Sequence, residues 1–303
     1  MERRAVFVNI DSMTDSNWFT SGTFILDGGW GTQFQLGGLG IGEHPDFWNL
    51  SHPEKVQEVA SAYVRAGSDI ILTNTFGSNR ILLAKHGADD KVAELNRAGV
   101  RLSKEVAKKQ NRRVFASIGP TGVMLTSGTV TPDELYTVFL EQTEAIAAEL
   151  PDGIVIETMS DPAEAVLAVK AAKATGLPVA ACLVFDTGKN KDRTMMGTTP
   201  EQAVEQLSAA GADIVGANCG QGIDGFIPIC QRMRAVTALP LWMKANAGLP
   251  EIVDGKTIYR QTPEKFAESA KELLAAGANF IGGCCGTTPE YIQALRECVS
   301  KHE

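Results

Sequence analysis

Short apolar runs alternate with longer amphipathic segments along most of the chain. Each run is continuously apolar rather than alternating with polar residues, which is typical of parallel strands that are buried on both faces. We therefore predict eight strands, at residues 24–27, 70–73, 114–118, 153–157, 179–184, 214–218, 241–244 and 280–283.

The segments between these runs have the periodicity of helices. Several open on Thr-Pro or Asp-Pro, which places an N-cap residue before a proline at the first helical position. Gly67, Gly211 and Gly277 each precede a predicted strand and can end the preceding helix in the left-handed conformation. The predicted helices include residues 53–66, 92–108, 132–148, 162–174, 200–210 and 263–276.

This order of elements predicts an α/β protein, a single (β/α)8 TIM barrel that spans residues 22–303. Residues 1–21 end in a polar, turn-rich stretch, and we interpret them as a short N-terminal extension. An open, doubly wound sheet is the alternative. It is disfavoured because no early Gly-x-Gly-x-x-Gly with a downstream acidic residue is present.

Composition narrows the class of function. The 303 residues include 28 Lys+Arg and 36 Asp+Glu, a net charge of −8, which argues against binding to nucleic acid or to an anionic membrane surface. No apolar stretch approaches the ~20 residues of a membrane span, and the N-terminus lacks a signal-peptide pattern. We expect a cytoplasmic protein, whose six cysteines are reduced thiols, metal ligands or nucleophiles rather than disulfides.

The residues at the carboxyl ends of the predicted strands are mostly polar or able to bind a metal, although the strands themselves are apolar. In (β/α)8 barrels the active site lies at this end. Lys244 ends the seventh strand, where it is either a cation in the pocket or an ion-paired lysine. The residues at the strand ends are Asp27, Asn74, Gly119, Glu157, Asp186, Cys219, Asn246, Cys284 and Cys285.

Three of the cysteines form a candidate metal site. Cys284 and Cys285 are adjacent, so their side chains would point to opposite faces of a regular strand unless the flanking glycines allow a kink. Cys219 ends the sixth strand, and together the three thiolates predict a catalytic metal, with zinc as first choice. Buried thiols or a strained vicinal disulfide are the alternative. The remaining cysteines are interpreted as small core residues: Cys182, Cys230 and Cys298.

These motifs resemble a known family. Gly-Gly-Cys-Cys-Gly at 282–286, Asn-Cys at 218–219 and Asp-Gly-Gly-Trp-Gly-Thr at 27–32 resemble the signatures of homocysteine S-methyltransferases. From about residue 22 onward, the chain is similar to the homocysteine-binding module of cobalamin-dependent methionine synthase. That similarity rests on Leu-Thr-Asn-Thr-Phe-Gly at 72–77, Lys-His-Gly at 85–87, Ile-Gly-Pro-Thr-Gly at 118–122, Asn-Ala-Gly at 246–248 and Gly-Lys-Thr-Ile-Tyr at 255–259.

The resemblance implies a zinc enzyme that transfers a methyl group to the thiol of homocysteine and yields methionine. Cys219, Cys284 and Cys285 would be the zinc ligands and the catalytic centre. Asp27 and Glu157 match the family's acidic residues that hold the substrate ammonium group, although either could be a solvated or helix-capping acid. Further candidates for substrate binding are the backbone N–H groups near Gly28 and Gly29, and Asn218.

The sequence defines the methyl donor less well than the acceptor, because we expect no cobalamin or folate module after the barrel. We expect methylcobalamin carried by a separate corrinoid protein. Betaine or a sulfonium such as S-methylmethionine is the alternative, because relatives that use such donors carry a tryptophan in the region of Trp48, and an aromatic face stabilises a cation. The alternative interpretation is that Trp48 only packs beside the entry loop. Phe76 is a second donor-side candidate.

Two other functions stay open: a methyltransferase or demethylase subunit of a corrinoid system that acts on another substrate, and a non-catalytic sensor with a zinc or redox-active cysteine cluster. A catalytic role has a clear physical reason. Only a few per cent of a free thiol is ionised at pH 7, and contact with zinc would ionise it. Three cysteine thiolates would also leave the site electron-rich, which agrees with a chain that has only four histidines.

Overall fold

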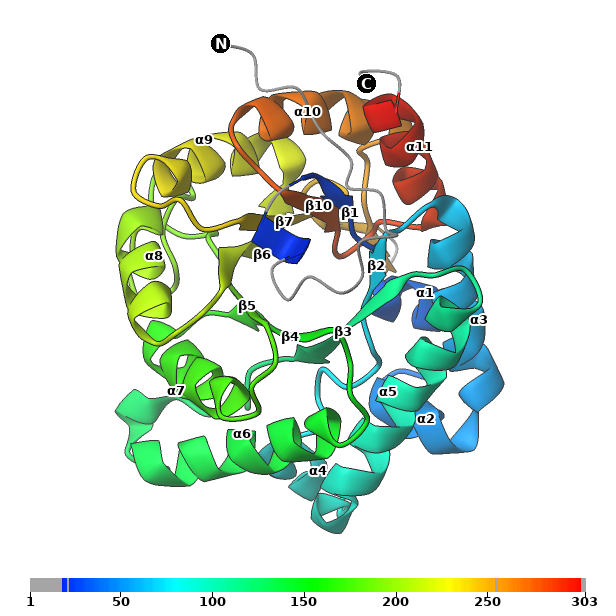
Figure 1. The fold of residues 1–303 in the computed structure, drawn as a ribbon, viewed down its shortest axis with the longest axis vertical. Coiled ribbons are helices and arrows are strands. Elements are labelled where there is room, and N and C mark those ends of the chain that lie inside the picture. The colour runs from blue at the N-terminus through cyan, green and yellow to red at the C-terminus, as the bar shows by residue number, and fades with distance from the viewer. Residues whose placement is uncertain (1–17, 21, 254–255, 301–303) are drawn as a thin grey trace.

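The computed structural model describes residues 18–20, 22–253 and 256–300, and they form one barrel with helices around it (Figure 1). Eight parallel strands pair side by side in the order β1-β10-β7-β6-β5-β4-β3-β2. This arrangement confirms the predicted (β/α)8 architecture. The strands are β1 Phe24–Ile25, β2 Ile70–Ile71, β3 Arg113–Ile118, β4 Gly153–Met159, β5 Val179–Leu183, β6 Ile214–Gly222, β7 Leu241–Asn246 and β10 Phe280–Gly283.

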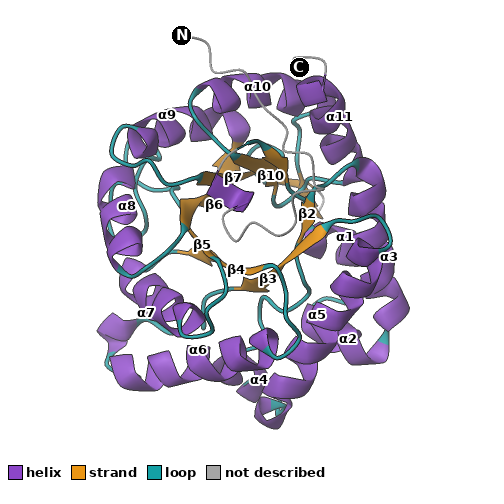
Figure 2. Cartoon of the chain, viewed as in Figure 1, coloured by secondary structure: helices purple, strands orange, loops and turns teal. Residues whose placement is uncertain are grey.

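The helices lie outside the ring of strands (Figure 2). Several begin where a threonine or aspartate side chain caps the first turn, and Thr131 and Thr199 each form a complete capping box. The α-helices are α1 Trp30–Leu36, α2 Trp48–Ser51, α3 Pro53–Ala66, α4 Arg80–Ala84, α5 Val92–Lys108, α6 Pro132–Ala147, α7 Pro162–Lys173, α8 Pro200–Ala209, α9 Ile223–Arg234, α10 Pro263–Ala275 and α11 Pro289–Ser300. Short 3-10 turns lie at η2 Trp18–Thr20, η3 Pro45–Phe47, η4 Asp89–Lys91 and η5 Leu125–Ser127.

Glycines end three of these helices as predicted. Gly67, Gly211 and Gly277 have φ angles of 104°, 104° and 106°, in the left-handed region that glycine adopts without a Cβ clash. Each turns the chain directly into β2, β6 or β10.

The loop after β7 carries an additional element, an antiparallel pair of β8 Glu251–Val253 and β9 Lys256–Ile258. It lies outside the main sheet, at the end of the barrel where β7 finishes. None of the described helices combines the length and the apolar character that crossing a bilayer requires.

The inside of the barrel is apolar toward the N-terminal ends of the strands and polar toward their C-terminal ends. Phe115, Val155 and Trp242 belong to the inner apolar cluster, while their chain neighbours belong to the cluster between strands and helices. Because side chains alternate along a strand, the residues two positions later face inward as well. These inward positions carry Ser117 in β3, Glu157 in β4, Asn218 in β6 and Lys244 in β7.

Part of the predicted N-terminal extension packs into the apolar end of the barrel. Trp18 and Phe19 in η2 are buried in the inner apolar cluster, and the Arg113 guanidinium lies 3.7 Å from the centre of the Trp18 ring. Residues 1–17 of the extension lie outside the described residues. The boundary at residue 21 stays a prediction.

Side-chain contacts help to join β1 and β2 where the ring of strands closes. The Asp69 carboxylate, just before β2, accepts a 2.8 Å hydrogen bond from the backbone N–H of Ile25, and the Asp69 N–H donates to the Ile25 carbonyl at 2.7 Å. Higher up, the Leu72 N–H donates to Asp27 Oδ2 at 2.7 Å. Asp27 is therefore part of the barrel closure as well as a candidate site residue.

Candidate functional site

Three cysteine side chains from distant parts of the chain meet at the C-terminal end of the barrel. Cys219 lies in β6, and Cys284 and Cys285 directly follow β10. Their sulfur atoms all lie within 4.8 Å of one another. Among the described residues, this is the one group of three or more His, Cys, Asp or Glu side chains that is close enough to hold a metal ion. The structure thus brings together the trio that the sequence analysis selected.

The backbone at these cysteines is kinked. Cys219 has a φ of 62° and is followed by Gly220 at 78°, and the pairing of β6 with β7 shifts register there. A left-handed φ on a non-glycine residue costs roughly 1–2 kcal/mol and often marks a functional site. After β10, the Cys284 carbonyl accepts hydrogen bonds from both the N–H (3.1 Å) and the hydroxyl (2.6 Å) of Thr287, and Gly286 has a φ of 79°. This turn is the kink predicted for the adjacent cysteines.

The spacing of the sulfurs fits a tetrahedral thiophilic ion. Two thiolates bound to one zinc at about 2.3 Å and a tetrahedral angle lie about 3.8 Å apart. The Cys219 and Cys285 sulfurs are 3.8 Å apart. The donor set of three sulfurs therefore suits a metal that prefers thiolate ligands.

The thiols interact strongly even without an ion. Hydrogen bonds from Cys284 and Cys285 lower the pKa of Cys219 to about 3. The hydrogen bond to Cys219 in turn raises the pKa of Cys285 to about 11 and that of Cys284 well above its usual value. Ionisation of Cys219 therefore disfavours ionisation of its two neighbours, and a cation among the sulfurs would favour ionisation of all three.

Asn218 connects the cysteine cluster to a buried carboxylate. Its side-chain N–H group lies 4.0 Å from Cys284 Sγ, donates to Thr158 Oγ1 at 2.8 Å and to Glu157 Oε2 at 3.3 Å, and its carbonyl accepts from the Thr158 N–H at 2.6 Å. Ser117 donates to the other oxygen of Glu157 at 2.5 Å. Burial raises the pKa of Glu157 above its usual value. Glu157 and Asn218, two predicted site residues, are therefore in direct contact.

Asp27 is buried in an ion pair. Lys244 Nζ lies 2.6 Å from Asp27 Oδ1, and the side chains are 3% and 0% exposed. Burial lowers the pKa of Lys244, but the negative charges of Asp27 and Glu157 outweigh this effect, so that its pKa is raised overall. The question that the sequence left open about Lys244 is answered here: it is ion-paired inside the barrel.

The glycines after Asp27 are used within the protein. The Gly29 N–H donates to both the carbonyl (3.1 Å) and the hydroxyl (3.0 Å) of Thr287. A Cβ on Gly28 would lie 2.8 Å from the Tyr63 ring, so glycine allows this close approach. Gly29 therefore joins the segment after β1 to the turn that carries the paired cysteines, and Gly28 leaves room for Tyr63.

Among the described residues, the polar and ring contacts of Trp48 include none of the three clustered cysteines. Its side chain is buried, its indole N–H donates to Glu43 at 2.7 Å, and the Lys55 ammonium lies 4.4 Å from the ring centre. Phe34 packs edge-on against the same ring. One aromatic face therefore already carries a cation from the protein itself.

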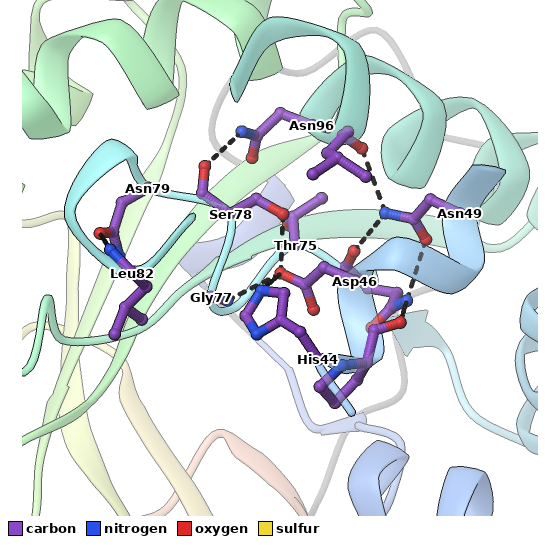
Figure 3. Close-up of polar contacts among 12 residues, drawn as sticks. His44, Asp46, Asn49, Thr75, Gly77, Ser78, Asn79, Leu82 and Asn96 are labelled. Carbon is purple, nitrogen blue, oxygen red and sulfur yellow. Dashed lines mark hydrogen bonds and ion pairs between the residues drawn. The ribbon is translucent and has the colours of Figure 1, made fainter. Parts of the chain in front are cut away.

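Phe76 is 37% exposed in the loop after β2, and its ring packs against Gly119 at the end of β3. A buried polar network holds this loop (Figure 3). Asp46 accepts hydrogen bonds from the Gly77 N–H at 2.8 Å and from the Ser78 hydroxyl at 2.7 Å. The connection between β1 and α3 thus fixes the loop that presents Phe76.

The other cysteines lie away from the cluster, and two of the three are buried core residues as predicted, whereas Cys298 is not. Cys182 and Cys230 are buried in β5 and α9, where burial raises the pKa of both thiols. Cys298 in α11 is partly exposed and donates to the Ala267 carbonyl at 3.1 Å.

The sequence analysis did not select several residues that touch the site. Ser117 and Thr158 contact Glu157 or Asn218, and Tyr259 packs its ring on Gly286 beside the paired cysteines. The alternation of inward and outward side chains would have identified Ser117, but the strands are almost continuously apolar, which hid that pattern.

Comparison with known proteins gives a consistent result. A sequence model of the family described as homocysteine S-methyltransferase matches residues 24–299. A methionine synthase of Mycobacterium leprae is 26% identical over 290 residues, which cover 91% of this chain and 24% of that protein. The chain therefore spans about a quarter of that relative's length.

Solved structures agree on the fold. The metallated form of the homocysteine methyltransferase MmuM from Escherichia coli superimposes with a TM-score of 0.76 at 22% identity, covering 91% of this chain and 96% of that one. The oxidized form of the same protein gives a TM-score of 0.75 at 21% identity, with coverage of 96% and 99%.

Proposed function

The chain belongs to the homocysteine S-methyltransferase family, and from this premise we propose that it transfers a methyl group to the thiol of homocysteine to give methionine at a zinc ion held by Cys219, Cys284 and Cys285. The observation that carries the proposal is the convergence of these three sulfurs within 4.8 Å at the C-terminal end of the barrel. Barrel enzymes place their chemistry at this end.

A bound zinc would act as a Lewis acid that keeps the acceptor thiol ionised at neutral pH. The residues of the chain position the zinc ligands and the carboxylate that would bind the substrate. The kinked turns at Cys219 and Cys284 direct the three sulfurs to one point, and Asn218 holds Glu157 beside them. Methyl transfer is a displacement at carbon, so rate depends on aligning the acceptor sulfur with the methyl group.

Glu157 is the proposed anchor for the ammonium group of homocysteine. Its carboxylate is buried and takes hydrogen bonds from the neutral groups of Ser117 and Asn218. A cationic ammonium group would compensate its negative charge.

We propose methylcobalamin on a corrinoid protein as the donor. Two features support it: the similarity to a methionine synthase, and the large apolar side chains that are exposed in loops after strands β2, β3, β5 and β7. These side chains include Phe76, Met124, Met195, Met196, Leu249 and Ile252. A betaine or sulfonium donor is less favoured, because Lys55 already lies over the Trp48 ring. The three closely spaced thiols also favour a reducing compartment such as the cytoplasm.

A donor screen tests this function. The zinc-loaded protein is incubated with homocysteine and methylcobalamin, a methylated corrinoid protein, S-methylmethionine or betaine, and methionine is measured by mass spectrometry. We expect methionine with the corrinoid donors, at a rate that Cys298→Ser preserves and Cys219→Ser abolishes. Methionine from S-methylmethionine alone would overturn the donor assignment, and no methionine from any donor would overturn the acceptor.

A further inference from the structure

The side chain of Lys244, in β7, reaches past the neighbouring strand β10 to Asp27, which follows β1. Lys244 pairs in register with Gly282 of β10, and β10 separates β7 from β1. Gly282 has no side chain, and a Cβ there would lie 2.6 Å from the Leu26 Cβ and 2.7 Å from the Asp27 carbonyl. The missing side chain thus lets β10 lie close to the end of β1, where the Asp27 carboxylate meets Lys244.

The Asp27 carboxylate has partners on both oxygens. Oδ1 pairs with Lys244 Nζ at 2.6 Å, and Oδ2 accepts from the Leu72 N–H at 2.7 Å and from the Trp30 indole N–H at 2.6 Å. The side chain is fully buried. An ammonium group from a substrate would have to displace Lys244 to pair with this carboxylate.

Glu157 has a different set of partners. Ser117 and Asn218 are its hydrogen-bond donors, and both are neutral. In the part of the chain that the structure describes, no ion pair within 4.0 Å includes Glu157. Lys244 acts on Glu157 only through space, while its ammonium group is bonded to Asp27.

The charges of Asp27, Glu157 and Lys244, which together form one polar layer inside the barrel, favour one additional cation. Lys244 balances the charge of Asp27 in their ion pair, whereas Glu157 has no ion-pair partner among the described residues and burial raises its pKa, which disfavours its ionised form. A buried charge without a partner is costly, and a second ammonium group next to Glu157 would balance the layer. The geometry directs that group to Glu157, because Lys244 already occupies Asp27.

We propose that Lys244 is a specificity-determining positioning residue: it takes the place of a substrate ammonium group at Asp27 and leaves Glu157 as the only carboxylate that binds the acceptor's ammonium. This inference rests on the proposed function of the site. It assigns to Glu157 alone the role that the sequence analysis gave to both carboxylates, and it makes Asp27 a structural partner of Lys244.

The test compares homocysteine with 4-mercaptobutyrate, which has the same thiol and carboxylate but no ammonium group. In the zinc-loaded protein, Glu157→Gln should reduce the preference for homocysteine about tenfold or more, because a hydrogen-bonded ion pair is lost. In Lys244→Met, the freed Asp27 can bind ammonium, so the preference should rise. In the double variant Lys244→Met/Glu157→Gln, Asp27 should restore a preference that Glu157→Gln alone lacks.

Lys244→Arg is the matched control, because it keeps the charge and should keep the preference. A lysine that only stabilises the fold would change both acceptors equally, and an unchanged ratio in Lys244→Met overturns the proposal. If Lys244→Met does not fold, Glu157→Gln alone decides: a retained preference for homocysteine places the ammonium at Asp27 and overturns it as well.

Calorimetry without a methyl donor measures the same preference as the ratio of the affinities for homocysteine and 4-mercaptobutyrate. If the unaltered protein binds neither thiol, the proposed acceptor fails and this inference fails with it. If it binds homocysteine but the ratios do not follow the variants, only the role of Lys244 is wrong.

Discussion

The sulfur of Cys219 lies 3.8 Å from the sulfur of Cys285, although the two residues are 66 positions apart in the chain. β6 and β10 are separated in the sheet by β7, so neither strand alone could bring the sulfurs together. The left-handed backbone at Cys219 and the turn after β10 direct them to one point. This relationship is the basis of the first two predictions.

Each of the three clustered cysteines is expected to be needed for zinc. Cys219→Ser, Cys284→Ser and Cys285→Ser should each lower bound zinc from about one ion per chain to near zero, because a hydroxyl is a poor substitute for a thiolate ligand. Methyl transfer should fall at least about a hundredfold. Zinc is measured by elemental mass spectrometry. Cys298→Ser is the control, and full zinc in Cys219→Ser would contradict the site.

Zinc affinity should rise with pH. The pKa of Cys219 is about 3, whereas that of Cys285 is about 11 and that of Cys284 lies well above its usual value. Between pH 6 and 8, zinc must therefore displace two protons, and its apparent affinity should increase up to about a hundredfold per pH unit. Calorimetry in buffers of different ionisation enthalpy counts the protons. Release of no protons would mean that the free cluster is already fully ionised.

Gly282→Ala should destabilise the fold by about 1–3 kcal/mol. Its Cβ would meet the backbone oxygen of Asp27 at 2.7 Å, and backbone cannot move aside easily. Gly31→Ala is the matched control: it lies in α1 with no atom within 4 Å of the added Cβ, and it should be neutral or stabilising by up to about 1 kcal/mol. Urea unfolding measures both. Equal stability of the two variants would show that the close approach of β10 to β1 does not require glycine.

Asp46→Ala should loosen the loop that presents Phe76. It would leave the buried Gly77 N–H without its acceptor, at a cost of about 1–3 kcal/mol. Limited proteolysis between β2 and α4 should become faster. The control is Asp89→Ala, whose exposed carboxylate lies 3.6 Å from Arg80 and should change stability by less than about 0.5 kcal/mol. Equal cleavage of both variants would argue against the Asp46 network as the support of this loop.

Much of the fold could be predicted from the sequence. Pro53–Ala66 and Val92–Lys108 begin and end at the predicted residues. The first has a proline at its start and a glycine stop, and both have an apolar period, all of which are local signals. The end of β6 was harder to predict. The strand runs to Gly222 rather than ending at residue 218, because the distorted pairing around Cys219 depends on β7.

For the candidate site, the sequence by itself determined which residue types stand at the strand ends. The paired cysteines and the polar residues there follow directly from the order of the chain, and parallel strands gather them at one edge. That reasoning needs no distances, so the choice of Cys219, Cys284 and Cys285 could be made without coordinates.

Only the tertiary structure decided how the charges are paired. Asp27 and Lys244 are 217 residues apart, and their ion pair forms only because β10 brings β1 and β7 close together in the sheet. The sequence treated Asp27 and Glu157 as equivalent carboxylates, because an electrostatic interaction depends on distance and burial, and neither is encoded in the local pattern of residues. Their different partners appear only when β1, β4, β7 and β10 are assembled into one barrel.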